Sequence, residues 1–295
     1  MQEIGPKELS GGIVPAVQVG HTIPQPAPRA HSLMPWLVEP RHLLRAARLC
    51  MRRAGGPGAD GMTWRAFRVD LHHRLADLGQ ALRAGTWQPG PMRLVEIPAY
   101  TGKVFTAVLP TVTDRVVHRA MRQALAGVLE TRVLADWVSA YRPRRSRVTA
   151  LRQAARHRAD GFAWVTDLDV AGASAGGDVG ELVDWLAAHV ADGAFLDRFR
   201  TALTGLPSPL MPGSGVWPVV FHLRLSRVDE QLAGLRVVRF ADNYAVFSVD
   251  EPAAVAAFEQ VTAALAAVGL AANARKSRIR PPAHALIEDL FLIDG

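Results

Sequence analysis

Two apolar segments of the chain carry aspartates where a strand or its turn is expected, and they constrain the fold more than any other feature. Residues 162–168 form an apolar run closed by acids, so we expect a buried strand ending in Asp167 and Asp169. Residues 236–249 predict a β-hairpin with Asp242 near its tip. An aspartate there is costly when buried without a partner, so it either forms the turn or holds a metal ion. Taken alone, the Asp-Asn pair favours the turn, because asparagine tolerates a left-handed backbone.

The remaining segments mix helices and strands without strict alternation. Apolar residues recur at helical spacing from residue 40 onward and over residues 64–82, 113–134, 148–158, 179–203, 219–232 and 251–270. Short strands are expected over residues 93–98 and 104–109, joined by a turn at Gly102 and Lys103, and over residues 278–280 and 290–293. This mixture predicts an α+β fold.

The chain is basic, with 34 Lys+Arg against 27 Asp+Glu and a formal net charge of +7. Arginine predominates among the cations, and its planar fork suits phosphate. A basic surface therefore favours an anionic polymer as partner. A genome rich in arginine codons would give the same balance, so the charge alone does not decide the function.

Composition also bears on the compartment. Cys50 is the single cysteine, so an internal disulfide is impossible and a reducing compartment fits. No apolar run approaches the ~18 residues that span a bilayer. Residues 1–30 lack the basic head and apolar block of a secretory signal, and their Pro and Gly content predicts a loosely ordered arm. We therefore expect a cytoplasmic protein without a membrane partner.

Seven segments in a fixed order carry a family resemblance. They are residues 58–63 with 85–89, residues 97–117, the Tyr-Arg-Pro-Arg-Arg-Ser loop at 141–146, Asp169, the loop at 213–218, the Phe-Ala-Asp-Asn turn at 240–243, and residues 269–276 with 291–292. In this order they resemble the motifs of the reverse transcriptases of group II introns and retrons. The corresponding family loop reads Phe-Arg-Pro-Gly-Arg-Ser, and the turn reads Tyr-Ala-Asp-Asp. The likeness extends from about Pro40 to the C-terminus.

The resemblance implies a polymerase-type right hand, with helical fingers and an antiparallel-sheet palm. Residues 1–36 would be a flexible N-terminal arm, residues 37–160 the fingers and residues 161–295 the palm. The chain ends soon after Phe291, so we expect the thumb to be absent. This leaves room for a partner protein in the place of the thumb.

The activity implied by the resemblance is RNA-directed DNA polymerisation, a two-metal nucleotidyl transfer. Asp169 and Asp242 would bridge two Mg²⁺ or Mn²⁺ ions, with the backbone carbonyl of Val170 as a further ligand. Lys276 would protonate the leaving pyrophosphate, and Lys103 would meet the incoming triphosphate. The partners would be an RNA or DNA template and its primer.

The resemblance also implies contacts to the nucleotide and the template. Ser174, Gly213 and Asn243 would lie beside the nucleotide, together with Val170 and Lys103. The basic loop would grip the template backbone without reading its sequence. The residues expected to do so are Arg142, Arg144, Arg145 and Arg147. The alternative for these arginines is an ordinary solvated loop.

Several positions depart from the family pattern, and they cluster around the nucleotide. Asn243 replaces the second Asp of the turn, which removes a negative charge near the metals. Ser174 stands where the family has an aromatic residue that excludes a 2′-hydroxyl, and Phe105 stands where an arginine grips the triphosphate. Met211-Pro212 takes the place of Pro-Gln. These changes predict weakened nucleotide binding and relaxed selectivity.

Two functions of different kinds remain open from the sequence. The first is an enzyme, a polymerase of relaxed selectivity that retains both metal-bridging aspartates. The second is a catalytically inactive pseudo-polymerase whose palm is a scaffold for nucleic acid or protein. Retention of Asp169 and Asp242 favours the first, and the lost nucleotide contacts favour the second. A decaying intron-encoded gene is a third reading, because a fold does not guarantee an activity.

Overall fold

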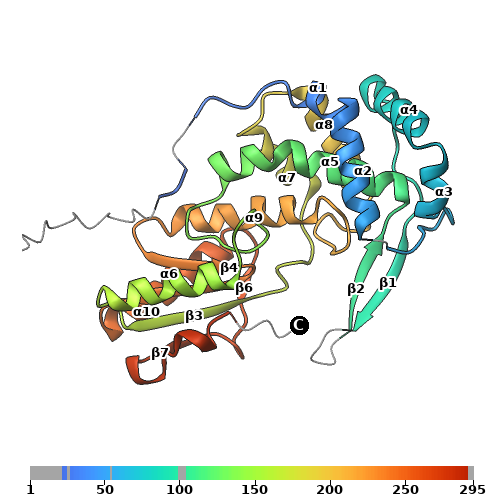
Figure 1. Cartoon of the computed structure of the whole chain (residues 1–295). Helices are drawn as coiled ribbons and strands as arrows, with labels where there is room; N and C mark the ends of the chain where they lie inside the picture. The colour runs from blue at the N-terminus through green and yellow to red at the C-terminus, as the bar shows by residue number, and fades with distance from the viewer. Residues whose placement is uncertain (1–21, 25–26, 54, 99–103, 292–295) are drawn as a thin grey trace, which may run out of the picture.

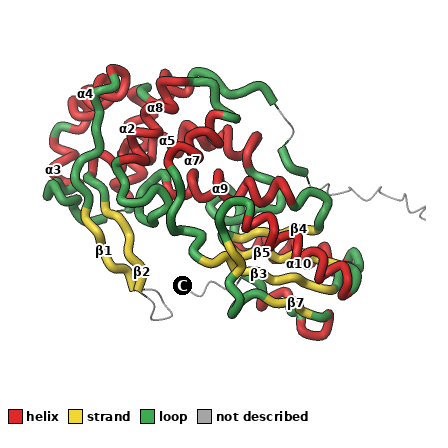
Figure 2. The backbone as a smooth tube through the Cα atoms, turned by 180° about the vertical axis from the view of Figure 1, so that it is seen from behind, coloured by secondary structure: helices red, strands yellow, loops and turns green. Residues whose placement is uncertain are grey.

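The structure is a computed structural model that describes residues 22–24, 27–53, 55–98 and 104–291. A layer of helices packs beside one β-sheet, and a separate hairpin projects from the same side of the helical layer at a distance from that sheet (Figures 1 and 2). Helices and antiparallel strands are mixed, as an α+β fold requires. In the described part of the chain, no helix is both long and apolar enough to cross a membrane.

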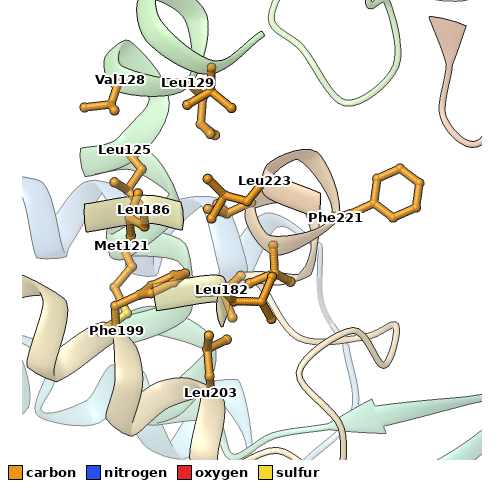
Figure 3. Close-up of a cluster of buried hydrophobic side chains, with 14 of the residues drawn as sticks. Met121, Leu125, Val128, Leu129, Leu182, Leu186, Phe199, Leu203, Phe221 and Leu223 are labelled. Atoms are coloured by element: carbon orange, nitrogen blue, oxygen red, sulfur yellow. The ribbon is translucent and has the colours of Figure 1, made fainter. Parts of the chain in front are cut away.

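The helical layer surrounds α5 (Val112–Val128), which continues into a π-turn, η1 (Leu129–Val133). The other helices of this layer are α1 (Leu33–Leu37), α2 (Pro40–Arg52), α3 (Trp64–Val69), α4 (Leu71–Ala84), α7 (Val179–Ala187), α8 (Gly193–Thr204) and α9 (Trp217–Gln231). Side chains of α5, α7 and α8 converge in a buried cluster that includes Met121, Leu125, Leu186 and Phe199 (Figure 3). Each such side chain contributes roughly 1.5–3 kcal/mol when it leaves water.

The larger sheet is antiparallel and has five strands in the order β4-β5-β3-β6, with β7 also paired to β3. Its strands are β3 (Trp164–Ala171), β4 (Arg236–Phe240), β5 (Asn243–Ser248), β6 (Ala271–Ala272) and β7 (Arg278–Arg280). Helix α10 (Glu251–Ala266) contacts one face, where the Thr166 hydroxyl donates to the Ala254 carbonyl at 2.8 Å. Helix α6 (Arg147–Ala159) contacts β4 and β5 from the other face.

The smaller sheet is the hairpin of β1 (Arg93–Pro98) and β2 (Val104–Leu109). The hairpin is largely exposed and is anchored at its base, where the Val108 N–H donates to the Pro212 carbonyl at 2.8 Å. The next residue, Gly213, has a φ of 105°, and an added β-carbon would lie 2.1 Å from the Val108 carbonyl oxygen. Only glycine therefore allows the two backbones to approach so closely.

Two helices expected as continuous are each divided in two. The helix predicted over residues 64–82 breaks at Asp70, although its apolar spacing continues across the break. The helix predicted over residues 179–203 ends before Val190, which pairs with Ala30 instead. The Asp192 side chain then caps α8 by accepting from the Phe195 N–H at 3.0 Å. Near Val190, a tertiary pairing and a cap thus override the helical period.

Both ends of the described chain also differ from expectation. Residues 290 and 291 do not begin the strand expected over residues 290–293; a short 3₁₀ turn η3 (Ile287–Asp289) follows η2 (Pro282–His284), and the carbonyls of Leu290 and Phe291 accept hydrogen bonds from Arg147. Residues 292 and 293 lie outside the described residues. Of the arm expected over residues 1–36, residues 1–21, 25 and 26 lie outside the described residues, and α1 begins near its end and buries Leu33 against the helical core.

Candidate active site

The two aspartates predicted to be catalytic come from neighbouring parts of the sheet, one in a strand and the other in the turn that leads into the adjacent strand. Asp169 in β3 pairs with Asn243, the first residue of β5, and Asp242 immediately precedes that strand. The Asp242 carbonyl accepts a hydrogen bond from the Val170 N–H at 3.1 Å. Asp169 and Asp242 line one cleft of about 420 Å³, together with Asp167, Val170, Asn243, Asn273, Arg275, Lys276 and Arg278. We call it the acidic cleft.

The turn that carries Asp242 has a left-handed backbone. Ala241 has a φ of 57°, a conformation that costs roughly 1–2 kcal/mol for a residue with a β-carbon. The Arg239 Nη1 donates a hydrogen bond to the Ala241 carbonyl at 3.0 Å, which holds the turn in this conformation. The residue immediately before Asp242 is therefore fixed by a side chain of the same hairpin.

Arg239 is in turn fixed by a buried ion pair with helix α9. Its Nη2 donates to Asp229 Oδ2 at 2.7 Å and its Nε donates to Asp229 Oδ1 at 3.0 Å. The Tyr244 hydroxyl donates to the same carboxylate at 3.2 Å. Burial has the largest single effect and lowers the pKa of Arg239, but the charges of Asp229 and Tyr244 and the hydrogen bond to Asp229 together raise that pKa above its usual value. The ion pair therefore ties the Asp242 turn to the helical layer.

Asp169 has two side-chain neighbours from the segment between β6 and β7. The Asn273 Nδ2 donates to Asp169 Oδ1 at 3.0 Å, and the Lys276 Nζ lies 3.7 Å from Asp169 Oδ2. The Asn273 N–H also donates to the Asp169 carbonyl at 2.8 Å, which positions this segment on β3. The predicted proton donor Lys276 is thus beside a predicted metal ligand.

Asp242 lies in a less favourable environment for a charge. Burial and the nearby charge of Asp169 raise the pKa of Asp242 above its usual value, and its own backbone N–H, Lys276 and Arg239 only partly offset them. The Asn243 Nδ2 donates to Asp242 Oδ1 at 3.3 Å. Because two carboxylates repel each other in a partly buried cleft, a cation between them would stabilise both.

The residues of the acidic cleft fit a Mg²⁺ ion that takes only part of its ligands from the protein and the rest from substrate oxygens and water. Within the described residues, no group of three or more His, Cys, Asp or Glu side chains is placed to hold a metal ion by itself. Mg²⁺ is often bound through only one or two carboxylates and completes its shell with water and substrate phosphates. Asp169 and Asp242 supply those carboxylates, and Arg275, Lys276 and Arg278 line the same cleft as cations suited to phosphate.

The residues predicted to contact the nucleotide separate into groups. Val170 and Asn243 line the acidic cleft, whereas Ser174, half-buried in the turn after β3, is not among its lining residues in the described chain. Gly213 lies against β2 and lines a different pocket. Lys103 lies outside the described residues.

Of the four arginines predicted to grip the template, three form hydrogen bonds within the protein itself. Arg142 forms an ion pair with Glu130 at 2.9 Å and donates to the carbonyls of Ala135 and Val138. Arg145 donates to the Asp136 carbonyl. Arg147 binds the carbonyls of the C-terminal segment, as described above. Arg144 is exposed. This geometry favours structural roles for three of them, while phosphate contact by Arg144 stays a prediction.

Sequence reasoning did not single out Asp229, Arg239 or Arg280, which hold the strands around the cleft. In β7, the Arg280 Nε and Nη2 donate to Asp167 Oδ2 at 2.9 and 2.5 Å, so a cation on the neighbouring strand pairs with Asp167. A signal in the sequence, a charged residue next to apolar ones in an apolar strand, existed for Arg239 alone, because Asp229 and Arg280 stand in polar stretches. Arg239 follows two buried valines.

The mixed fold and the paired aspartates define a protein of the reverse-transcriptase type, as the motif order predicted. The chain belongs to the reverse transcriptase (RNA-dependent DNA polymerase) family, whose sequence model matches residues 98–286.

The individual proteins that the chain resembles share only part of its sequence or a low identity with it. Protein YkfC of Escherichia coli (strain K12) is 33% identical over 108 residues, which make up 36% of this chain and 28% of YkfC. The match therefore spans little more than a quarter of that relative. Two solved structures, a partial Cas6-RT-Cas1–Cas2 complex and a Cas6-RT-Cas1–Cas2 complex, each match at 15% identity with a TM-score of 0.44. They cover 74% of this chain and 38% and 24% of their own chains.

Proposed function

We propose that this protein binds an RNA or DNA template with its primer and transfers nucleotides by RNA-directed DNA polymerisation, using divalent ions at Asp169 and Asp242. Residues 37–160 would form the fingers and residues 161–295 the palm. The observation that supports this proposal best is the common cleft of the two carboxylates, which adjacent antiparallel strands bring to the same edge of the sheet.

Each residue of this site would have a separate role in the proposed reaction. Mg²⁺ or Mn²⁺, when bound, would stabilise the negative charge that develops on the attacking and leaving oxygens. Asp169 and Asp242 would hold the ions, with the Val170 carbonyl in reach of the same cleft. Lys276 would donate a proton to the departing pyrophosphate, and Arg275 and Arg278 would bind its oxygens.

The nucleotide site would select weakly between sugars. Ser174 offers no ring to exclude a 2′-hydroxyl, and the amide of Asn243 donates a hydrogen bond to Asp242 where the family has a second carboxylate. Removing one negative charge lowers the electrostatic attraction for a second divalent ion. We therefore expect slow incorporation and little preference between deoxyribonucleotides and ribonucleotides.

A catalytically inactive scaffold is the second candidate, and one observation favours it. Asp169 already has a hydrogen bond from Asn273 and a cation, Lys276, at its second oxygen. A carboxylate satisfied in this way loses two favourable contacts when a metal ion displaces them. In this case the protein would bind nucleic acid or a partner protein without extending a primer.

Primer extension tests the proposal directly. The purified protein is incubated with a primed RNA template, Mg²⁺ or Mn²⁺, and labelled deoxyribonucleotides or ribonucleotides. We expect extension by the wild type and its loss, by at least ~10²-fold, in Asp242→Asn, which keeps the size of the side chain but removes the charge.

The control for this assay is Asp77→Asn, because Asp77 is exposed on α4 with His73 as its partner and is far along the chain from the site. Extension that survives Asp242→Asn, or that Asp77→Asn also abolishes, would overturn the metal role of Asp242. Binding of the template without any extension by the wild type would support the scaffold.

A further inference from the structure

The segment that follows β3, residues 172–177, contains only glycine, alanine and serine. We call it the glycine turn. Gly172, Gly176 and Gly177 have φ values of 61°, 67° and 90°, left-handed conformations that glycine adopts without strain. The turn begins at the acidic cleft, which Gly172 lines. Because it has no side chain larger than serine, its position depends on contacts from other parts of the protein.

Side chains from two other segments donate hydrogen bonds to the glycine turn. The Ser208 hydroxyl donates to the Gly176 carbonyl at 3.0 Å, and the Arg224 Nη1 donates to the Ala175 carbonyl at 2.8 Å. Within the turn, the Ala175 N–H donates to the Gly172 carbonyl at 2.8 Å. Hydrogen bonds from charged donors are roughly twice as strong as neutral ones. The guanidinium of Arg224 is therefore the stronger of the two external supports.

Arg224 is a buried cation on α9, the helix that lies between the helical layer and the larger sheet (Figures 1 and 2). It is 9% exposed, and its Nη2 donates to the Val268 carbonyl at 3.3 Å. Both of its side-chain hydrogen bonds thus go to carbonyls, and among the described residues no carboxylate accepts one. Burial lowers the pKa of Arg224, and the charge of Glu181 only partly offsets burial. An apolar side chain is often as stabilising as a buried cation, so the particular contribution of this arginine is its directed donors.

Through these two bonds, Arg224 links the glycine turn to the end of α10. Val268 lies just beyond the C-cap of that helix, where the carbonyls carry partial negative charge. The chain then enters β6, which pairs with the end of β3, and the next residue, Asn273, donates to Asp169. One guanidinium therefore fixes the glycine turn relative to the segment that supports Asp169.

We infer that Arg224 is a positioning residue, which holds the glycine turn so that Ser174 lies beside the sugar of the incoming nucleotide. This role rests on the proposed function, in which Ser174 takes the place of a ring that excludes a 2′-hydroxyl. Ser174 is half-buried in the middle of the turn, one residue from the carbonyl that Arg224 binds. Arg224 acts through the turn and not on the nucleotide itself. A released turn would bind nucleotides more weakly, and a ring placed at position 174 would no longer select between sugars.

Hydrogen–deuterium exchange of residues 172–177 tests the positioning role without any catalysis. Arg224→Met keeps an unbranched side chain and removes both donors. Loss of a hydrogen bond from a charged group shifts the equilibrium that it supports by about 10- to 100-fold. We expect the Ala175 N–H to exchange faster by about that factor. Arg224→Lys offers one nitrogen in place of two and should give an intermediate rate. Unchanged exchange in Arg224→Met would overturn the positioning role, whether or not the protein is a polymerase.

The matched control is Arg227→Met, three residues further along the same helix. The Arg227 side chain is 42% exposed and pairs with Glu230 at 2.7 Å, so its loss should leave exchange in the glycine turn unchanged. Faster exchange throughout α9 and β3 in Arg224→Met would show a general structural role and contradict a positioning one. Where Arg224→Met does not fold, the same measurement on Arg224→Lys decides, since it keeps the charge.

Primer-extension kinetics test the link to the nucleotide. Arg224→Met should raise KM for nucleotides roughly tenfold and leave kcat nearly unchanged, because binding and not the chemical step is affected. Ser174→Tyr adds a ring, and it should favour deoxyribonucleotides over ribonucleotides by roughly tenfold or more in kcat/KM. Combining it with Arg224→Met should abolish that preference, and a preference that survives would refute the link. Absence of extension by the wild type would refute the proposed function and the sugar role with it, while the exchange rates would still decide whether Arg224 fixes the turn.

Discussion

The two β-hairpins of this protein have the same antiparallel ladder but opposite surroundings. In β4–β5 the central residues are buried from both faces, by α10 on one side and α6 on the other. In β1–β2 all but the last part of β2 is exposed or half-exposed. An isolated two-stranded hairpin is marginally stable in water, so packing and not the ladder decides rigidity. The hairpin that carries Asp242 is therefore a fixed support, whereas β1–β2 depends on its anchored base.

Matched phenylalanines give the sharpest test of this difference. Phe247 in β5 is 2% exposed and Phe105 in β2 is 43% exposed. Phe247→Ala should lower the free energy of unfolding by about 3–5 kcal/mol, because it leaves a cavity. Phe105→Ala should change it by less than about 1 kcal/mol. Urea denaturation measures both, and similar losses for the two variants would remove the distinction between the hairpins.

The buried Arg239–Asp229 pair is the second test. Arg239→Leu should destabilise the fold by about 3–5 kcal/mol, because Asp229 is left charged and buried without its partner. Replacing both residues by leucine should recover much of that loss, since the uncompensated charge is then gone. Denaturation of the two variants measures this.

Primer-extension activity distinguishes two roles of Arg239, namely holding the Asp242 turn in place and stabilising the fold. The double variant should still extend a primer poorly, because the Ala241 carbonyl no longer has its donor and the Asp242 turn is released. Arg236→Leu, in a half-buried position of the same strand, is the control. Full activity in the stable double variant would show that Arg239 does not position Asp242.

A smaller, pH-dependent effect is expected at Asp242. Its pKa is raised in the folded chain, chiefly by burial, so folding favours the protonated carboxyl. That contribution to stability is full below the unfolded value, 3.8, and is lost as pH rises through the raised value. Asp242→Asn should therefore raise the melting temperature in EDTA at neutral pH by a few degrees, with the gain vanishing in acid. A lower melting temperature at neutral pH would contradict this sign.

The hairpin with Asp242 could be predicted because its apolar alternation and its turn residues agree. The pairing of residue 169 with residue 243 could not, because no local pattern fixes the register between β3 and β5. That residues 169 and 242 lie close together was expected only from the order of the family motifs. The break near Val190 escaped prediction for a related reason, since the bridge to Ala30 and the Asp192 cap leave the apolar spacing unchanged. The apolar spacing also continues across the break at Asp70, whose side chain forms no cap hydrogen bond.

The arginines show the limit of reading charge from sequence. A cluster over residues 142–147 predicts a template grip, yet three of its side chains bond to nearby carbonyls or to Glu130. By contrast, Arg53, which directly follows α2, lines one pocket with Arg115, Arg119 and Arg122 of α5, so these arginines form no run in the sequence. Folding, and not spacing along the chain, brings them together.

Mn²⁺ affinities measured across a double-mutant cycle test most directly whether Asp169 and Asp242 share a divalent ion. Titration calorimetry would compare the wild type, Asp169→Asn, Asp242→Asn and the double variant. We predict that each single variant weakens binding by more than about tenfold, since even outer-shell changes at metal sites cost about 10- to 100-fold. The double variant should lose little more, because one ion is already lost. Independent losses that multiply, or a single variant with undiminished affinity, would contradict the shared site.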